Sequence, residues 1–298
     1  MAMNSQILSK EQVLIVGCGD IGARFAKVLP EQLYQVTGLR RSECPDLPYL
    51  RYQVCDVTDE GYLAEIIRQG EFAVILVSMT PAERSDAGYK RAYVQTCQNL
   101  LACLKRYARR PRLVMFISST AVYGQDDDAF VDEYSSTRPE SFSGQRLLEA
   151  EELLRNSGFP NLIARFSGIY GPGRNRLLNL VRQGRASLSP HITNRIHADD
   201  GAAALAHLVE LSRAGVPLQN IYIVSDSAPA PLAEVNHWLA RHMNIGLETV
   251  PEDAKERGNK RCSNKLLLAT GFQLRYPDYI AGYTALLEAE TQEGQVHI

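Results

Sequence analysis

The chain has 298 residues, of which 45% are hydrophobic and 22% charged, and its formal net charge is −2. This balance is typical of a globular protein, and the small negative charge argues against general binding to nucleic acid or to anionic membranes. No apolar run approaches the roughly 20 residues needed to cross a bilayer. The six cysteines lack a metal-type spacing, and the N-terminal residues lack the pattern of a signal peptide. We therefore expect a cytoplasmic protein with reduced thiols and no metal site, nucleic-acid partner or membrane partner.

Short apolar runs alternate with helical patterns along the first part of the chain. The predicted strands are 13–16, 34–39, 52–56, 72–77, 113–117 and 162–166, and the predicted helices are 23–29, 59–68, 82–109 and 142–156. This order predicts an α/β protein with a doubly wound parallel sheet of the Rossmann type, in which ligands bind beyond the carboxyl ends of the strands.

The pattern becomes less regular after residue 170. Helices are predicted at 175–183, 199–212 and 232–242, and strands at 195–197 and 221–224. We expect a dinucleotide-binding Rossmann core at 1–173, to which 194–228 returns. The segments 174–193 and 229–298 are expected to form a smaller mixed lobe that binds the substrate.

The first predicted strand ends in Gly17-Cys18-Gly19-Asp20-Ile21-Gly22, a Gly-x-Gly-x-x-Gly motif that opens into a helix. The first glycine permits a tight turn, the second lets the backbone approach a pyrophosphate, and the third lets helix and strand pack closely. The N-terminus of the helix adds N–H groups and positive potential. A preceding strand and a following helix make the motif specific, so it predicts a dinucleotide site; the alternative is a purely structural turn.

The end of the second predicted strand indicates which dinucleotide. An NAD-binding protein usually has an Asp or Glu there, about 20 residues after the glycine motif, to hold the ribose hydroxyls. This chain has Arg40-Arg41-Ser42 instead. Two guanidinium groups can hold a 2′-phosphate through bidentate hydrogen bonds, which favours NADP over NAD. The alternative is a solvated basic turn.

Three later segments follow the glycine motif in a fixed order: Ser118-Ser119-Thr120-Ala121-Val122-Tyr123-Gly124, Arg165-Phe166-Ser167-Gly168-Ile169-Tyr170-Gly171-Pro172-Gly173 and Asn194-Arg195-Ile196-His197-Ala198-Asp199-Asp200. Together they resemble the extended short-chain dehydrogenase/reductases, the NAD-dependent epimerase/dehydratase family, over residues 13 to about 200. Segments 260–264 and 276–283 are similar to a compact atypical branch. The resemblance implies a nicotinamide cofactor that oxidises or reduces a hydroxyl or carbonyl of a small-molecule substrate, often a nucleotide sugar. It also implies a homodimer paired through helices near 84–109 and 140–156.

The resemblance implies roles for individual residues. Ser119 takes the position of the catalytic Ser or Thr, whose hydroxyl hydrogen-bonds the reacting oxygen; the alternative is that Ser118, Ser119 and Thr120 only cap a strand end. Asp56 is similar to the residue that meets the adenine ring. We expect cofactor contacts from Gly17, Gly19, Asp20, Ile21, Gly22, Arg40, Arg41, Ser42, Asp56, Val57, Ser78, Ser118, Arg146 and Phe166, and substrate contacts from Thr120, Tyr170, Arg174, Arg195 and His197.

The sequence departs from the family at its Tyr-x-x-x-Lys pair, in which the Lys favours the phenolate so that Tyr can transfer a proton. The best register places Phe142 at the Tyr and Arg146 at the Lys. Phe142 has no proton to give, whereas Arg146 keeps a charge that can bind ribose hydroxyls. Tyr134 and Arg138 have the same spacing but precede Pro139 in a predicted loop.

Two hypotheses follow from this departure. The first is an NADP-dependent oxidoreductase or epimerase in which Ser119, Tyr123 and Arg146 are the catalytic candidates, with Tyr170 and His197 as other substitutes for the lost phenol. Each of these tyrosines and the histidine has a structural alternative as a packed residue. The second hypothesis is an NADP(H)-binding redox sensor or scaffold with little catalysis, because losing a general acid typically costs on the order of 10²–10⁴ in rate.

Overall fold

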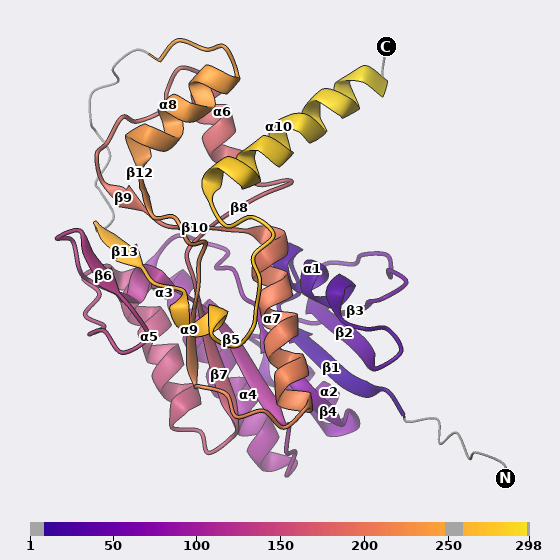
Figure 1. The fold of residues 1–298 in the computed structure, drawn as a ribbon. Coiled ribbons are helices and arrows are strands. Elements are labelled where there is room, and N and C mark those ends of the chain that lie inside the picture. Colours follow the sequence, from indigo (N-terminus) through magenta and orange to yellow (C-terminus); the bar gives the residue numbers. More distant parts are fainter. Residues whose placement is uncertain (1–8, 248–258, 297–298) are drawn as a thin grey trace, which may run out of the picture. The chain divides into compact units, whose positions relative to one another are not determined.

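The computed structural model describes residues 9–247 and 259–296 (Figure 1). The chain divides into two compact units. Unit 1 comprises Met1–Ser118, Phe142–Ala164 and Leu205–Asn220, and unit 2 comprises Ser119–Ser141, Arg165–Ala204 and Ile221–Ile298. The domain boundaries expected from the sequence stay a prediction. The N-terminal residues in which we expect no signal peptide lie outside the described part of the chain.

The central feature is a seven-stranded parallel sheet with the strand order β11-β7-β5-β4-β1-β2-β3, which confirms the predicted Rossmann-type α/β fold. Its strands are β1 (Glu11–Val16), β2 (Tyr34–Arg40), β3 (Arg51–Val54), β4 (Phe72–Val77), β5 (Leu113–Ser119), β7 (Asn161–Phe166) and β11 (Ile221–Val224). In this register Val16 at the end of β1 lies opposite Leu39 of β2 and Val77 of β4. The carboxyl ends of these strands therefore meet at one edge of the sheet.

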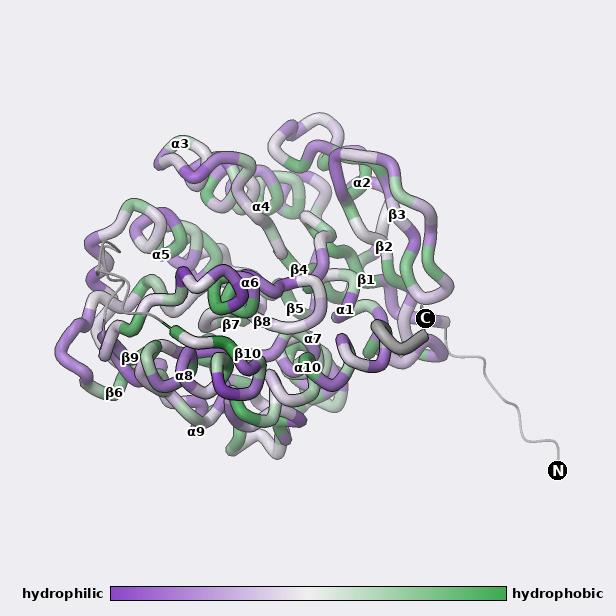
Figure 2. Tube along the Cα trace, turned by 90° about the horizontal axis from the view of Figure 1, so that it is seen from above, coloured by the Kyte–Doolittle hydropathy of each residue, from purple (hydrophilic) through white to green (hydrophobic). Residues whose placement is uncertain are grey.

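Helices cover both faces of the part of the sheet that lies in unit 1. Figure 2 shows α2, α4 and α5 on one face, and α1 with the second half of α7 on the other. The helices are α1 (Asp20–Val28), α2 (Glu60–Gln69), α3 (Asp86–Tyr89), η1 (Lys90–Gln95), α4 (Thr96–Arg106), η2 (Thr120–Val122), α5 (Phe142–Arg155), α6 (Arg176–Arg182), α7 (Ala198–Arg213), α8 (Leu232–His242), α9 (Lys265–Leu268) and α10 (Tyr279–Val296). Continuous apolar strands explain this layering, because β1 and β4 are buried on both faces.

The long helix predicted over 82–109 is present as continuous helical backbone over 86–106, but it is shorter at both ends and contains a π-helical segment. The chain forms α3, the π-helical segment η1 and α4 in succession. Ser85 is the N-cap of α3, because its side chain accepts a hydrogen bond from the Gly88 N–H at 3.1 Å. The last helix ends at Arg106, and Ala108 adopts a left-handed conformation with φ of 50°. A capping serine thus delays the start of the helix, and a left-handed residue ends it early.

Unit 2 contains short strand pairs that the sequence pattern did not reveal in full. They are β6 (Ala129–Val131) with β13 (Lys260–Cys262), β8 (Gly168–Tyr170) with β10 (Arg195–His197), and β9 (Ile192–Thr193) with β12 (Ala230–Pro231). A buried cluster that includes Tyr170, Trp238, Tyr279 and Tyr283 forms a core within this unit. Among the described helices of either unit, none has the length and apolar character needed to span a bilayer.

Candidate dinucleotide site

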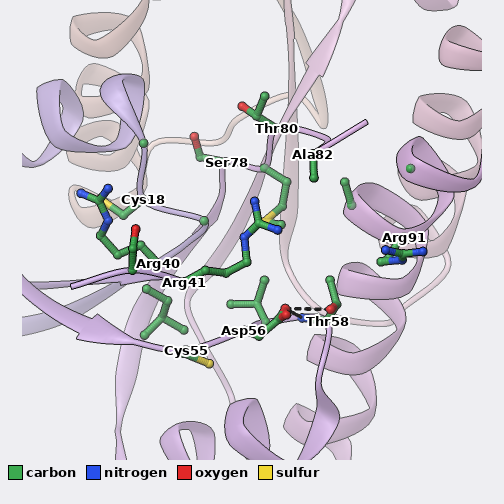
Figure 3. A pocket seen from close by; sticks show the side chains of 18 of the residues that line it. Cys18, Arg40, Arg41, Cys55, Asp56, Thr58, Ser78, Thr80, Ala82 and Arg91 are labelled. Atoms are coloured by element: carbon green, nitrogen blue, oxygen red, sulfur yellow. Dashed lines mark hydrogen bonds between the residues drawn. The ribbon is translucent and has the colours of Figure 1, made fainter. Parts of the chain in front are cut away.

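Unit 1 contains a cavity of about 300 Å³ at the carboxyl ends of β1, β2, β3 and β4 (Figure 3). Eight of the predicted cofactor residues line it: Gly17, Gly19, Arg40, Arg41, Ser42, Asp56, Val57 and Ser78. They come from four separate strand ends, which the parallel sheet brings to one edge. The structure therefore gathers most of the predicted cofactor residues at one place.

The glycine loop leaves room for a ligand at one position and none at another. Gly17 has a φ of +84°, and a Cβ there would lie 2.4 Å from Met79 Sδ. A Cβ on Gly22 would lie 2.9 Å from Ile15 Cγ2, so this glycine serves helix-to-strand packing. A Cβ on Gly19 would meet nothing within 4 Å. The loop thus has a tight turn at Gly17 and open space at Gly19, which is the arrangement that a pyrophosphate needs.

Two consecutive arginines at the end of β2 line the cavity, and their surroundings differ. The Arg40 guanidinium lies over the Tyr52 ring at 5.4 Å, and its Nε is buried without a hydrogen-bond partner among the described residues. Arg41 is exposed. A buried guanidinium N–H that lacks an acceptor is costly, so Arg40 offers a donor to an anionic ligand.

Asp56 follows β3 and lies on the same cavity. Its carboxylate accepts hydrogen bonds from the Thr58 hydroxyl at 2.7 Å and from the Thr58 N–H at 3.0 Å. These bonds, helped by the charges of Arg41 and Arg91, lower the pKa of Asp56. A carboxylate held in this way is an acceptor for a donor on a bound ligand.

The other predicted cofactor residues are not among those that line the cavity: Asp20, Ile21, Gly22, Ser118, Arg146 and Phe166. Asp20 opens α1 and pairs with Arg24 at 2.8 Å, while Ile21 is buried. The buried Ser118 hydroxyl donates to Glu151 Oε1 at 2.5 Å. In unit 2, Phe166 is buried against Gly201, where a Cβ would come within 2.5 Å of its ring.

Arg146 and Phe142 both contact the α3 helix. Arg146 donates to both carboxylate oxygens of Asp86, at 2.8 and 2.9 Å, and to Glu149 at 2.7 Å. The Phe142 ring meets the Tyr89 ring edge-on, with centroids 5.5 Å apart. The guanidinium is thus already bound by two carboxylates, which disfavours the predicted contact to ribose hydroxyls. We call these two contacts, Arg146–Asp86 and Phe142–Tyr89, the α3–α5 clasp.

The predicted catalytic residues Ser119 and Tyr123 lie in unit 2. The Ser119 hydroxyl accepts a hydrogen bond from the Ala121 N–H at 3.1 Å, which leaves its own proton for donation. Tyr123 is buried, donates to the Asp132 carbonyl at 2.8 Å and accepts from Arg165 at 2.8 Å. Burial raises the pKa of Tyr123 above its usual value. These contacts favour the structural alternative for Tyr123.

The predicted substrate residues are mostly enclosed in unit 2. His197 lies between the rings of Tyr170 and Tyr276, at 5.3 and 4.0 Å, and its Nδ1 accepts from the Asp199 N–H. Tyr170, Arg195 and His197 are all buried, and Thr120 hydrogen-bonds Cys262. Arg174 is partly exposed, and its N–H bonds the Gly171 carbonyl. The packing favours the structural alternatives for Tyr170 and His197.

Sequence reasoning missed one wall of the cavity. Thr58, Met79, Thr80, Ala82, Glu83, Gly88, Arg91 and Ala92 also line it. Thr58 could have been found from its place two residues after Asp56, because Asp and Thr at this spacing often hydrogen-bond locally. No pattern in the sequence marks Arg91, which lies within the predicted long helix.

The residues of the cavity fit a dinucleotide. The open space at Gly19 suits a pyrophosphate, and the unpartnered Arg40 Nε suits an anionic group. The carboxylate of Asp56, which Thr58 holds in place, suits a donor on an adenosine. Each of these features lies within unit 1.

Comparisons with known proteins agree with this fit. The model of the NAD dependent epimerase/dehydratase family matches residues 13–246. A Methylobacillus flagellatus structure of the NAD-dependent epimerase/dehydratase type is 39% identical, with a TM-score of 0.79, over 95% of this chain and 100% of the other. No curated protein sequence matches the chain.

Two more distant structures share the fold. The Bordetella bronchiseptica enzyme WbmG, solved with NAD, is 16% identical with a TM-score of 0.79, and 97% of each chain is covered. The UDP-glucose 4-epimerase of Thermotoga maritima, solved with UDP-glucose, is 16% identical with a TM-score of 0.77, over 91% of this chain and 96% of the other. With the family model matched from the glycine motif to α8, the chain belongs to the NAD-dependent epimerase/dehydratase family.

Proposed function

We propose that the protein binds NADP(H) in the cavity of unit 1 and uses it to oxidise or reduce a hydroxyl or carbonyl group of a small-molecule substrate. The observation that carries the proposal is the pair Arg40 and Arg41, which line the cavity at the end of β2, where a carboxylate would favour NAD. When bound, the cofactor supplies or accepts a hydride. Arg40 and Arg41 would hold its 2′-phosphate, the loop at Gly19 its pyrophosphate, and Asp56 its adenosine.

The substrate side of this proposal rests on Ser119. Its hydroxyl proton is not used by the bond from Ala121, so it can donate to the reacting oxygen. A nucleotide sugar is the substrate class that the family resemblance favours. We also propose a cytoplasmic homodimer that pairs through the helices near 84–109 and 140–156. Light scattering that finds only monomer would reject the dimer.

Thermal unfolding with NADPH, NADP⁺, NADH and NAD⁺ at matched concentrations tests the cofactor. A ligand at 100 times its dissociation constant stabilises the folded state by about 2.7 kcal/mol. We expect a larger rise in melting temperature with NADPH and NADP⁺, because Arg40 and Arg41 line the cavity and their positive charges would attract the 2′-phosphate. A larger rise with NADH or NAD⁺ would overturn the choice of NADP, and no rise with any of the four would overturn the site.

A second function, an NADP(H)-binding protein with little catalysis, is favoured by the α3–α5 clasp. Phe142 carries no proton, and Arg146 is bound to Asp86 and Glu149 rather than left to face a ligand. In this alternative the family's catalytic positions hold two helices together. Substrate turnover by the wild-type protein decides between the two functions.

We expect the wild-type protein to oxidise NADPH with at least one member of a panel of aldehydes, ketones and nucleotide sugars, followed by absorbance at 340 nm. The binding-protein alternative expects no turnover by the wild type, but turnover by Phe142→Tyr or by Phe142→Tyr with Arg146→Lys. The reason is that a restored phenol supplies the general acid, typically worth on the order of 10²–10⁴ in rate. Phe130→Tyr is the matched control, because Phe130 is 70% exposed and lies in unit 2 on β6. Robust wild-type turnover would exclude the alternative.

A further inference from the structure

The wall of the cavity that sequence reasoning missed carries a third arginine. Arg91 lies on η1 and lines the cavity together with Gly88 and Ala92. Figure 3 shows Arg91 on the helical side and Arg40 and Arg41 on the strand side, with Asp56 and Thr58 drawn between them. The cavity thus has cationic side chains on two different walls.

Several contacts fix this wall in position. Ser85 caps α3 through the Gly88 N–H, and a Cβ on Gly88 would lie 2.4 Å from the Glu83 carbonyl oxygen. The α3–α5 clasp binds the same short helix through Asp86 and Tyr89. Arg91 follows Tyr89 by two residues. The backbone just before Arg91 is therefore held in position without a ligand.

Arg91 lies in the π-helical segment η1. A π turn contains more residues than an α turn and is often found at functional sites. The clasp residues Asp86 and Tyr89 precede this turn, and Arg91 and Ala92 lie within it. The residues just before the π turn thus contact α5, and two residues within the turn line the cavity.

The charges of Arg41 and Arg91 both act on the Asp56 carboxylate. Both guanidinium groups lower the pKa of Asp56, so both lie within electrostatic reach of this carboxylate. Asp56 and Glu83 are the carboxylates that line the cavity, against three arginines. The charged side chains of the lining therefore have a net charge of +1, and an anionic group fits best between the two walls.

We propose that Arg91 is a specificity residue that binds the 2′-phosphate of NADP(H) from the helical wall, opposite Arg41. The inference rests on the proposed function, since it assigns a second cation to the same cofactor. A guanidinium matches the geometry of a phosphate and forms charge-assisted hydrogen bonds with it. Arg91 should therefore discriminate between the phosphorylated and the unphosphorylated adenosine.

The test compares Arg91→Ala with the wild type in calorimetric titrations of NADPH, NADH, 2′,5′-ADP and 5′-AMP. Loss of a hydrogen bond to a charged group typically costs on the order of 10-fold or more in affinity. We expect such a loss for NADPH and 2′,5′-ADP, and a change of less than about twofold for NADH and 5′-AMP. Arg91→Lys should recover part of the loss. Arg84→Ala is the matched control, because Arg84 is an exposed arginine just before α3 that does not line the cavity.

Each other outcome has a definite meaning. Equal weakening of all four ligands would overturn the inference, because it would place Arg91 on the adenine ring or show that the wall had moved. An unchanged preference for NADPH in Arg91→Ala would overturn it while leaving the proposed function intact. A wild-type protein that binds NADH as tightly as NADPH would overturn both, before any variant is made.

Discussion

Replacing Asp226 by asparagine is expected to stabilise the folded protein by about 4 kcal/mol at pH 8, and to change its stability little at pH 4. Asp226 follows β11 in unit 2 and is fully buried. One carboxylate oxygen accepts from the Ala228 N–H at 3.2 Å, and the other has no hydrogen-bond partner among the described residues. A carboxylate in such a place is costly to ionise.

Burial raises the pKa of Asp226 from 3.8 to about 7. The charge of Arg195 opposes this rise, whereas Asp278 and Asp200 add to it, and Tyr170 and Tyr283 also lie near. The folded state therefore keeps a proton that the unfolded state releases above pH 4. The free energy of unfolding falls as the pH rises from about 4 to about 7 and is level beyond that. The total fall is about 1.4 kcal/mol for each unit of difference between the folded and the unfolded pKa. Asparagine mimics the neutral acid and removes this loss.

Urea unfolding followed by Trp238 fluorescence at several pH values between 4 and 8 measures the effect. Trp238 is the single tryptophan of the chain and lies in the same unit as Asp226. Asp126→Asn is the control, because Asp126 is an exposed carboxylate of unit 2. A stability difference between Asp226→Asn and the wild type that is the same at pH 4 and pH 8 would contradict the assignment.

Local patterns were enough to predict the sheet and the strand side of the cavity. The apolar runs of β1 and β4 signal buried parallel strands, and a parallel sheet necessarily brings their carboxyl ends together. Gly17 directly follows β1, Arg40 ends β2 and Asp56 lies two residues after β3, so their convergence follows from chain order in a parallel sheet. The predicted cofactor contacts themselves stay predictions.

Long-range pairing explains what the sequence did not reveal. Arg146 was expected to contact ribose hydroxyls from its register alone, but its partner Asp86 lies sixty positions away in the chain. Arg91 lies in a helical stretch with no sequence motif around it, so its place on the cavity depends on how the helix packs. In unit 2, β6 pairs with β13, which is more than a hundred residues distant. Such contacts depend on tertiary geometry and not on local propensity.

Replacing Arg41 by aspartate is expected to invert the cofactor preference, changing the NADPH-to-NADH affinity ratio by on the order of 100- to 1,000-fold. Arg41 is the exposed member of the arginine pair and acts electrostatically on Asp56, whereas Arg40 packs over Tyr52. The variant removes a cation from the 2′-phosphate and brings a carboxylate that repels it. The same carboxylate can accept hydrogen bonds from the ribose hydroxyls of NADH.

Titration of the two reduced cofactors into Arg41→Asp, at low and at physiological salt, measures this ratio. Arg84→Asp imposes the same change of charge on a residue of unit 1 that does not line the cavity, and it should keep the wild-type preference. Salt should weaken NADPH binding to the wild type more than to Arg41→Asp, because screening acts on the lost attraction. Retention of the NADPH preference by Arg41→Asp would move the 2′-phosphate away from the end of β2, and the case for NADP would then depend on Arg91 and Arg40 alone.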